Sequence, residues 1–193
     1  MIKPLYLFVG PSGSGKTTIV DKLECERRYK SIQSYTTRPQ RYTNEYGHIF
    51  ISDSDFDRLE NIVAYTEYNG FRYCATEELI NESDLYVVDC DGVETLLEKY
   101  SNKERVICIF YFDTTVTTRI DRMIDRDDSD TAIVSRLRND EKFDWYKKLD
   151  QLVWHNAKIE NRNIELHKIN ANVSQTEVWD QVIYYMNKLE GTQ

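Results

Sequence analysis

The sequence predicts a three-layer α/β fold with a central parallel sheet, a small, mostly antiparallel lobe and a helical lid. Three observations support this prediction. The chain opens with a buried-strand pattern, a glycine-rich loop and a helical pattern in direct succession. Short apolar runs then alternate with helical patterns, as in parallel sheets. Between them, residues 33–83 carry a strong hairpin signal instead.

The 193 residues are enough for one domain with a sizeable hydrophobic core. We expect a core formed by residues 1–32 and 84–193, an inserted lobe at about 33–83 and a lid at about 126–140. Neither a linker nor a low-complexity segment nor an internal repeat divides the chain.

Composition and charge exclude several classes of protein. Hydrophobic residues at 40% and charged residues at 30% are typical of a globular chain rather than a disordered one. No apolar run approaches the ~20 residues that a membrane-spanning helix needs, and the N-terminal run is too short for a secretory signal, so we expect a cytoplasmic protein without a membrane partner. The net charge of −8 argues against a general nucleic-acid binder, and no obligate protein partner is evident.

The cysteines and histidines show no metal-binding or disulfide pattern. No C-x-x-C pair is present, so we expect reduced, mostly buried thiols. The histidines are isolated and are expected to lie on the surface or to pack. These residues are Cys25, Cys74, Cys90, Cys108, His48, His155 and His167.

Residues 10–17, Gly-Pro-Ser-Gly-Ser-Gly-Lys-Thr, fit the phosphate-binding motif G-x-x-x-x-G-K-[ST] without substitution. Glycines let the main chain curve around an anion, and the helix that follows adds its positive end. Lys16 would supply a cation for β- and γ-phosphates, and the Thr17 hydroxyl a ligand for Mg²⁺. The alternative is a Gly/Ser-rich turn with a chance lysine, which the flanking strand (residues 5–9) and helix disfavour. The expected phosphate-binding residues are Gly10, Pro11, Ser12, Gly13, Ser14, Gly15, Lys16, Thr17 and Thr18.

An arginine pair follows the next predicted strand, residues 30–35. Residues 36–41 interrupt that strand with a proline and two arginines. Arg38 and Arg41 lie three apart beside hydroxyl groups, so they form either a clamp for an oxyanion or the surface of a solvated loop. This stretch alone favours neither reading.

The remainder of the lobe begins with a predicted strand at 47–51. A short helix at 53–59 follows, with Ser52 or Asp53 as its expected cap. Predicted strands at 63–68 and 71–75 then flank Asn69-Gly70, the strongest short hairpin signal that a sequence can carry.

Residues 85–89 predict a buried parallel strand that places Asp89 at its carboxyl edge. Beside a phosphate-binding loop, a carboxylate there would help to hold Mg²⁺ and its waters. The alternative for Asp89 and Asp91 is a turn or a cap before a helix at 92–99. We favour the site for Asp89 and leave Asp91 open.

The most apolar stretch, residues 105–112, is predicted to be a central strand. Asp113 or Thr114 is expected to cap a helix that ends at about residue 125. A polar hinge at 126–130 then precedes a long helical pattern from 131 to 152.

Arginines crowd this helical region. Most are expected to be surface charges paired with the many aspartates, while one or two are candidates to fold over a bound nucleotide as a mobile lid. They are Arg119, Arg122, Arg126, Arg136 and Arg138.

The chain ends with a predicted strand at 164–170 and a helix that Ser174 and Glu177 open as a capping box. The aromatic pair Tyr184-Tyr185 in that helix is expected to pack.

This order of motifs resembles the guanylate kinase family over nearly the whole chain. The specific part begins Ser34-Tyr35-Thr36-Thr37-Arg38-Pro39-Gln40-Arg41 and continues to Glu45 and Gly47. It is similar to the family signature S-x-T-T-R-x-x-R-x-x-E-x-x-G, with Glu45 one place late.

The resemblance implies a P-loop kinase fold and transfer of the γ-phosphoryl group of ATP to GMP or dGMP, with Mg²⁺. The implied catalytic residues are Lys16, Arg38, Arg126 and Arg136. The implied acceptor-binding residues are Ser34, Arg38, Arg41, Glu45, Glu67, Tyr73, Asp89 and Asp91, and Thr17 and Asp89 would serve the metal.

The departures from the family concern the acceptor's base. Ala64 and Ala75 stand where the family has a glutamate and a serine that contact guanine. The stretch from Gly47 to Phe50 is two residues short and lacks a phosphate-binding tyrosine. Glu67 is a candidate for the lost carboxylate, although strand alternation would turn it to the other face. Two alternatives stay open: a phosphosugar kinase of the ribose 1,5-bisphosphate phosphokinase type, and a non-catalytic guanylate kinase-like interaction module.

Overall fold

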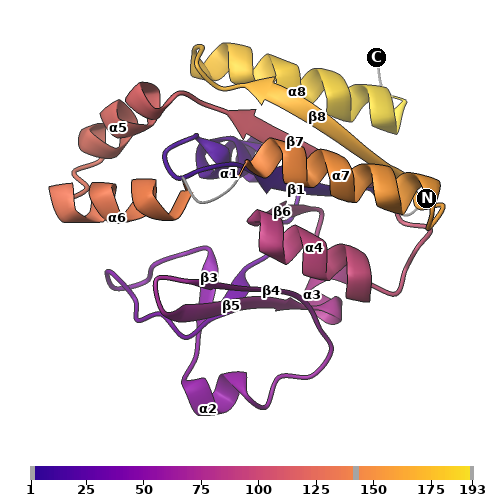
Figure 1. Ribbon diagram of the computed structural model, residues 1–193, viewed down its shortest axis with the longest axis horizontal. Helices are drawn as coiled ribbons and strands as arrows, with labels where there is room; N and C mark the ends of the chain where they lie inside the picture. Colours follow the sequence, from indigo (N-terminus) through magenta and orange to yellow (C-terminus); the bar gives the residue numbers. More distant parts are fainter. Residues whose placement is uncertain (1–2, 141–143, 192–193) are drawn as a thin grey trace.

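The computed structural model describes residues 3–140 and 144–191 (Figure 1). Its central sheet has the strand order β6-β1-β7-β8, and all the pairings are parallel. The strands are β1 (Leu5–Val9), β6 (Leu85–Val87), β7 (Ile107–Asp113) and β8 (Ile164–Asn170). Strands β1 and β7 lie in the middle of the sheet and are almost entirely apolar, because helices cover both of their faces.

Two layers of helices enclose this sheet. Helices α1 (Lys16–Arg27) and α8 (Gln175–Glu190) bury Leu23 and Val182 against one face. Helices α4 (Cys90–Lys99) and α7 (Trp145–Lys158) bury Leu96 and Leu149 against the other. Figure 1 shows α8 and α4 on opposite sides of the sheet. The predicted three-layer α/β fold is therefore confirmed.

A second sheet lies beyond α4, with the strand order β3-β2-β5-β4 (Figure 1). Its strands are β2 (Ser34–Thr36), β3 (His48–Phe50), β4 (Ile62–Tyr68) and β5 (Phe71–Thr76), with the short helices α2 (Asp53–Phe56) and α3 (Glu77–Asn81) beside them. Only the pairing of β2 with β3 is parallel. Asn69 and Gly70 both have positive φ angles, 53° and 77°, as the predicted tight hairpin requires.

Helices α5 (Val116–Asp125) and α6 (Asp130–Asp140) lie together at one end of the central sheet (Figure 1). The cap of α5 is Thr115, so the predicted caps Asp113 and Thr114 are wrong. Asp113 is still part of β7, where its carboxylate pairs with Lys168 at 2.9 Å. The hydroxyl of Thr114 turns back to the carbonyl of Phe112.

The long helix predicted from 131 to 152 is also wrong, because two helices, α6 and α7, occupy this range. Residues 141–143 lie outside the described part of the chain. Asp144 starts the second helix, since its carboxylate accepts a hydrogen bond from the main-chain N–H of Lys147 at 3.1 Å. Helical periodicity continues through such a cap, so the sequence pattern did not reveal it.

Three predicted strands are shorter than expected, among them β3, which covers His48–Phe50 of the predicted range 47–51. Strand β6 ends at Val87, because Asp89 instead caps α4. Only Ser34 and Tyr35 of the strand predicted at 30–35 belong to β2, while Ser31 makes a single bridge to Leu85. The last strand and the capping box of α8 are confirmed.

The structure also bears on the expectations for the cysteines, the Tyr184-Tyr185 pair and membrane-spanning helices. All four cysteines are free, and three of them are buried, whereas Cys25 is exposed. Tyr185 stacks on His167, and the ring of Tyr184 lies edge-on to that of Tyr185 with centroids 5.2 Å apart, so the predicted packing is confirmed, although Tyr184 is 63% exposed. In the described residues, no helix has both the length and the apolar character needed to cross a bilayer.

Candidate active site

The glycine-rich loop joins β1 to α1 and packs tightly against its surroundings. Gly13 and Gly15 have φ angles of 78° and 91°, which side-chain-bearing residues rarely adopt. A Cβ atom on Gly13 would lie 2.8 Å from the carbonyl oxygen of Arg119 on α5. Gly13 is therefore required for both conformation and space, and Gly15 for conformation.

Lys16, the first residue of α1, folds its side chain over this loop. Its Nζ donates to the carbonyl oxygens of Gly10 and Pro11 at 2.6 and 2.8 Å and to Ser14 Oγ at 3.1 Å. Loss of solvent around the ammonium group lowers the pKa of Lys16 to about 8; the Asp140 carboxylate opposes this shift. The loop thus holds a cation at its centre.

A buried ion pair holds the loop from the side of α5 and α6. Arg119 Nε donates to the Ser12 carbonyl at 2.8 Å, and its guanidinium group pairs with Asp140. Asp140 also accepts from the Ser12 N–H at 2.9 Å. Both charged side chains are less than a tenth exposed. Arg119 is therefore paired with an aspartate, as expected for most of these arginines, but it is buried rather than on the surface.

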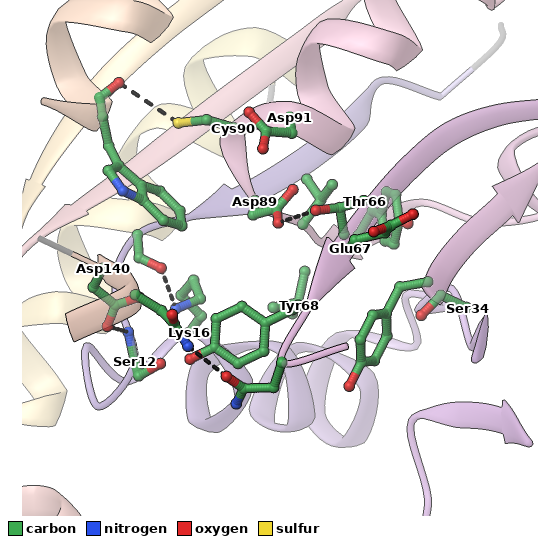
Figure 2. Close-up of a pocket in the computed structure, with 18 of the residues that line it drawn as sticks. Ser12, Lys16, Ser34, Thr66, Glu67, Tyr68, Asp89, Cys90, Asp91 and Asp140 are labelled. Atoms are coloured by element: carbon green, nitrogen blue, oxygen red, sulfur yellow. Dashed lines mark hydrogen bonds between the residues drawn. The ribbon is translucent and has the colours of Figure 1, made fainter. Parts of the chain in front are cut away.

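One cavity, of about 380 Å³, lies between this loop and the second sheet (Figure 2). We call it the lobe-side cavity. It brings together five of the predicted acceptor-binding residues, namely Ser34, Glu67, Tyr73, Asp89 and Asp91. From the loop it is lined by Gly10, Ser12 and Lys16.

A second cavity, of about 460 Å³, lies on the other side of the loop and is here called the helix-side cavity. It is lined by residues 12–19 and by the predicted lid residues Arg126 and Arg136. Both of these arginines pair with Asp128, at 2.5 and 3.5 Å. Ser12 and Lys16 line both cavities, so the glycine-rich loop separates the two.

Asp89 takes the capping role that the sequence left as one alternative, and it also lies in the wall of the lobe-side cavity. It caps α4 by accepting from the Gly92 N–H at 2.8 Å, and it lines the lobe-side cavity. Thr66 Oγ1 donates to its other oxygen at 2.6 Å (Figure 2). Burial raises the pKa of Asp89, and these two hydrogen bonds oppose that shift. Asp91 instead pairs with Lys148 at 2.6 Å.

The two arginines of the signature are held by Glu45. Arg38 is buried and binds both Glu45 oxygens, at 2.8 and 3.2 Å. The Arg41 N–H donates to the same carboxylate at 2.8 Å, while the Arg41 side chain is 56% exposed. Within the described residues, neither arginine lines either cavity. Glu45 therefore orients the pair in this conformation.

Among the residues of the lobe-side cavity that the sequence reasoning did not predict are His48, Tyr68 and Trp145. His48 packs edge-on against Tyr73, as a packing histidine was expected to do, and its Nδ1 also lies 2.9 Å from Ser34 Oγ; burial lowers its pKa. Its place directly after Gly47 of the signature was the available signal. Tyr68 and Trp145 belong to no motif that the sequence displays.

The two alanines at the guanine-contacting positions do not reach the lobe-side cavity. Ala64 and Ala75 are fully buried and pack in the hydrophobic core beneath it. Glu67 is exposed and does line the cavity, where its carboxylate accepts from the Tyr65 hydroxyl at 2.5 Å. The polar lining on this side of the molecule thus differs from the pattern of the family.

Comparison with known proteins gives one consistent result, although no family model matches the chain. The guanylate kinase of Legionella pneumophila (strain Paris) is 27% identical over 179 residues, 86% of this chain and 84% of the relative. That of Thermotoga maritima is 34% identical over 51% of this chain and 53% of its own. The crystal structure of guanylate kinase from Anaplasma phagocytophilum shares the fold, with a TM-score of 0.54 at 14% identity, over 97% of this chain and 86% of that one.

The three-layer fold, the loop and these similarities define an α/β protein of the nucleoside monophosphate kinase class. Within that class, the chain is similar to guanylate kinases. The phosphosugar kinase and the non-catalytic interaction module are not favoured, since the relatives named here are guanylate kinases.

Proposed function

We propose that this protein transfers the γ-phosphoryl group of ATP to the phosphate of GMP or dGMP, giving ADP and the nucleoside diphosphate. The observation that carries the proposal is that Ser12 and Lys16 line both cavities. A triphosphate seated on the loop from the helix-side cavity would face a monophosphate in the lobe-side cavity. Phosphoryl transfer depends mainly on such alignment and on neutralisation of charge.

On the donor side, the main-chain amides of the loop would bind the triphosphate, with Lys16 between the two substrates. Arg126 and Arg136 line the same cavity, and in the described part of the chain both pair with Asp128. We propose that both guanidinium groups turn toward phosphate oxygens; the Arg126 side chain is 47% exposed, and an ion pair at that exposure is weak. They would then neutralise charge that develops during transfer.

On the acceptor side, Ser34, Tyr73 and Asp89 would bind the monophosphate from the cavity wall. Glu45 accepts from the Arg38 guanidinium group and from the Arg41 main-chain N–H, and the Arg41 guanidinium group lies 3.9 Å from the same carboxylate. A phosphate dianion would compete with this carboxylate for the guanidinium groups. We therefore propose that acceptor binding reorients the arginine pair.

The donor set near the loop fits Mg²⁺ that comes with the nucleotide. Thr17 lines the helix-side cavity and Asp89 the lobe-side cavity, and both offer the hard oxygen ligands that Mg²⁺ prefers. Among the described residues, no three His, Cys, Asp or Glu side chains are grouped to hold a metal. Phosphate oxygens and water would complete its coordination, and the ion would neutralise charge on the β- and γ-phosphates.

An ADP-release assay tests the proposal directly. ATP and Mg²⁺ are supplied with GMP, dGMP, AMP, CMP, UMP or ribose 1,5-bisphosphate, and with EDTA as a control. We expect turnover with GMP and dGMP at least about tenfold above the other acceptors, since a mismatched base leaves buried polar groups unpaired. Absence of ADP release with every monophosphate, despite ATP binding, would overturn the proposal.

A further inference from the structure

Three buried side-chain atoms lack a hydrogen-bond partner in the described part of the chain: Arg38 Nε, Tyr68 Oη and Trp145 Nε1. Buried polar groups are almost always paired, so each exception calls for an explanation such as a missing water or ligand. All three can donate a hydrogen bond. Tyr68 and Trp145 line the lobe-side cavity, and Arg38 belongs to the arginine pair beside it. The unpaired donors therefore gather where the acceptor is proposed to bind.

Tyr68 has the most informative position of the three. It is the last residue of β4, directly before the Asn69-Gly70 turn. Figure 2 shows its ring extending from this strand toward Lys16 and the glycine-rich loop. Asn139 of α6 donates a hydrogen bond to Asn69, so the tip of the hairpin is in contact with the lid helix. The Tyr68 hydroxyl thus lies at the end of the cavity nearest to the loop.

The unpaired hydroxyl group of Tyr68 lowers the stability of the ligand-free protein. Burying a hydroxyl group without a partner is unfavourable, and phenylalanine would fill the same volume without that cost. A negatively charged oxygen in the cavity would turn the cost into a gain, since hydrogen bonds to charged acceptors are stronger than those between neutral groups. Near Lys16, the oxygens that the proposed substrates bring are those of phosphate.

We propose that the Tyr68 hydroxyl donates a hydrogen bond to an oxygen of the acceptor's phosphate, which makes Tyr68 an acceptor-binding residue for the reaction. This inference rests on the proposed function. It adds a phosphate contact from β4 to a site whose stretch from Gly47 to Phe50 is short. Trp145, with its own unpaired N–H in the same cavity, shows that the lining as a whole is built for a ligand rich in oxygen.

The experiment compares two Tyr→Phe substitutions. Tyr68→Phe is expected to leave the melting temperature of the free protein unchanged or slightly raised, because no hydrogen bond is lost. The same variant is expected to bind GMP about 10- to 100-fold more weakly in calorimetry and to lose a similar factor in kcat/KM for GMP, with KM for ATP unchanged.

Tyr100→Phe is the matched control. Tyr100 is fully buried, and its hydroxyl donates to Asn81 Oδ1 at 2.7 Å, away from both cavities. This variant is expected to lower the melting temperature by about 2–4 °C and to leave the kinetic constants unchanged. The two variants should therefore show opposite patterns.

Two results would overturn the inference. The first is an active wild-type enzyme whose GMP affinity is unaffected by Tyr68→Phe; the proposed function would then stand without Tyr68. The second is a loss of stability in Tyr68→Phe equal to that in Tyr100→Phe, which would reveal a structural partner for the phenol. Wild-type protein that neither binds nor phosphorylates any monophosphate would remove the proposed function itself, and this outcome is distinct from both.

Discussion

The two cavities beside the glycine-rich loop differ in how fully the polar groups around them are hydrogen-bonded. On the helix side, Arg122 donates to the carbonyls of Ser14 and Ala171, and Arg119 to that of Ser12. In the described part of the chain, no buried side-chain atom that lines this cavity lacks a partner. On the lobe side, Tyr68 and Trp145 present unpaired donors. The loop beside the helix-side cavity is therefore held by hydrogen bonds, whereas two buried donors of the lobe-side cavity have no partner among the described residues.

This difference has a physical cause. A cradle of main-chain amides is held by the backbone, so glycine conformation and a few carbonyl contacts are enough to fix it before a ligand arrives. Recognition of an acceptor depends on side chains from several elements, and each of these needs its own partner. Fixed groups lose little free energy on binding, while unpaired groups gain from a ligand that matches them. We therefore expect substitutions on the two sides to have different signatures.

The largest effect is expected from Lys16→Met, which removes the cation shared by both cavities. We expect kcat to fall by at least about 10³-fold, because Lys16 neutralises the transferring phosphoryl group and methionine does not. The fold should persist, since the pKa of Lys16 is lowered to about 8 and its charge is therefore unfavourable in the folded state. Kinetics and urea denaturation check both expectations. Activity within tenfold of the wild type would contradict the mechanism.

Linkage gives this variant a second readout. Between pH 8 and the unfolded pKa of about 10.5, the unfolded chain binds more protons at Lys16 than the folded one. Stability from this group should therefore rise with pH across that window in the wild type. Lys16→Met should lack that rise.

The next effect tests how firmly the helix side is held. Arg119→Met leaves Asp140 buried without its ion-pair partner and removes the donor to the Ser12 carbonyl. We expect a loss of about 3 kcal/mol in the free energy of unfolding, measured by urea denaturation. Arg138→Ala, on the exposed face of α6, is the control and should stay within about 0.5 kcal/mol. Equal stability of the two variants would mean that the buried pair does not hold the loop.

The smallest of the three effects is expected on the lobe side, from Asp89→Asn. Asparagine keeps the cap of α4 but removes the carboxylate from the cavity. We expect kcat/KM for GMP to fall by about 10- to 100-fold. Burial raises the pKa of Asp89, so wild-type activity should decline on the acid side at a higher pH than an ordinary carboxyl group would cause.

The raised pKa of Asp89 should also appear in the stability of the wild-type protein. There a rise in pH acts in the direction opposite to its effect on activity. Between the ordinary and the raised pKa of Asp89, the folded state binds more protons, so the contribution of this group falls as pH rises. Asp89→Asn should abolish both this dependence and the acid limb of the pH–rate profile. An unchanged acid limb in the variant would assign it to another group.

Features of the fold and site that depend on a few consecutive residues could be predicted from the sequence, whereas features that depend on packing could not. The phosphate-binding motif, the Asn69-Gly70 turn and the capping box at Ser174 each depend on a few consecutive residues, and the last two are confirmed by the geometry. Ser34 and Tyr73 were predicted from the resemblance to the family and Asp89 from its place at the end of a predicted strand, and all three line one cavity. The cap of α5 and the break between α6 and α7 escaped, because adjacent polar residues compete for such roles and only packing selects among them.

The amino-acid sequence by itself determined the strand, loop and helix at the N-terminus and the order of the elements, because φ angles, caps and apolar periodicity act over a few neighbouring residues. It also carries the resemblance to guanylate kinases. Only the tertiary structure decided that Arg119 is buried against Asp140, that His48 and Tyr68 reach the cavity, and that Glu45 holds both arginines of the signature. The Arg119–Asp140 ion pair and the lobe-side cavity join residues that are far apart in the chain. The hydrogen bonds from Arg38 and Arg41 to Glu45 form only when the loop between these residues has folded. None of these contacts exists until the chain has packed, so no local pattern records them.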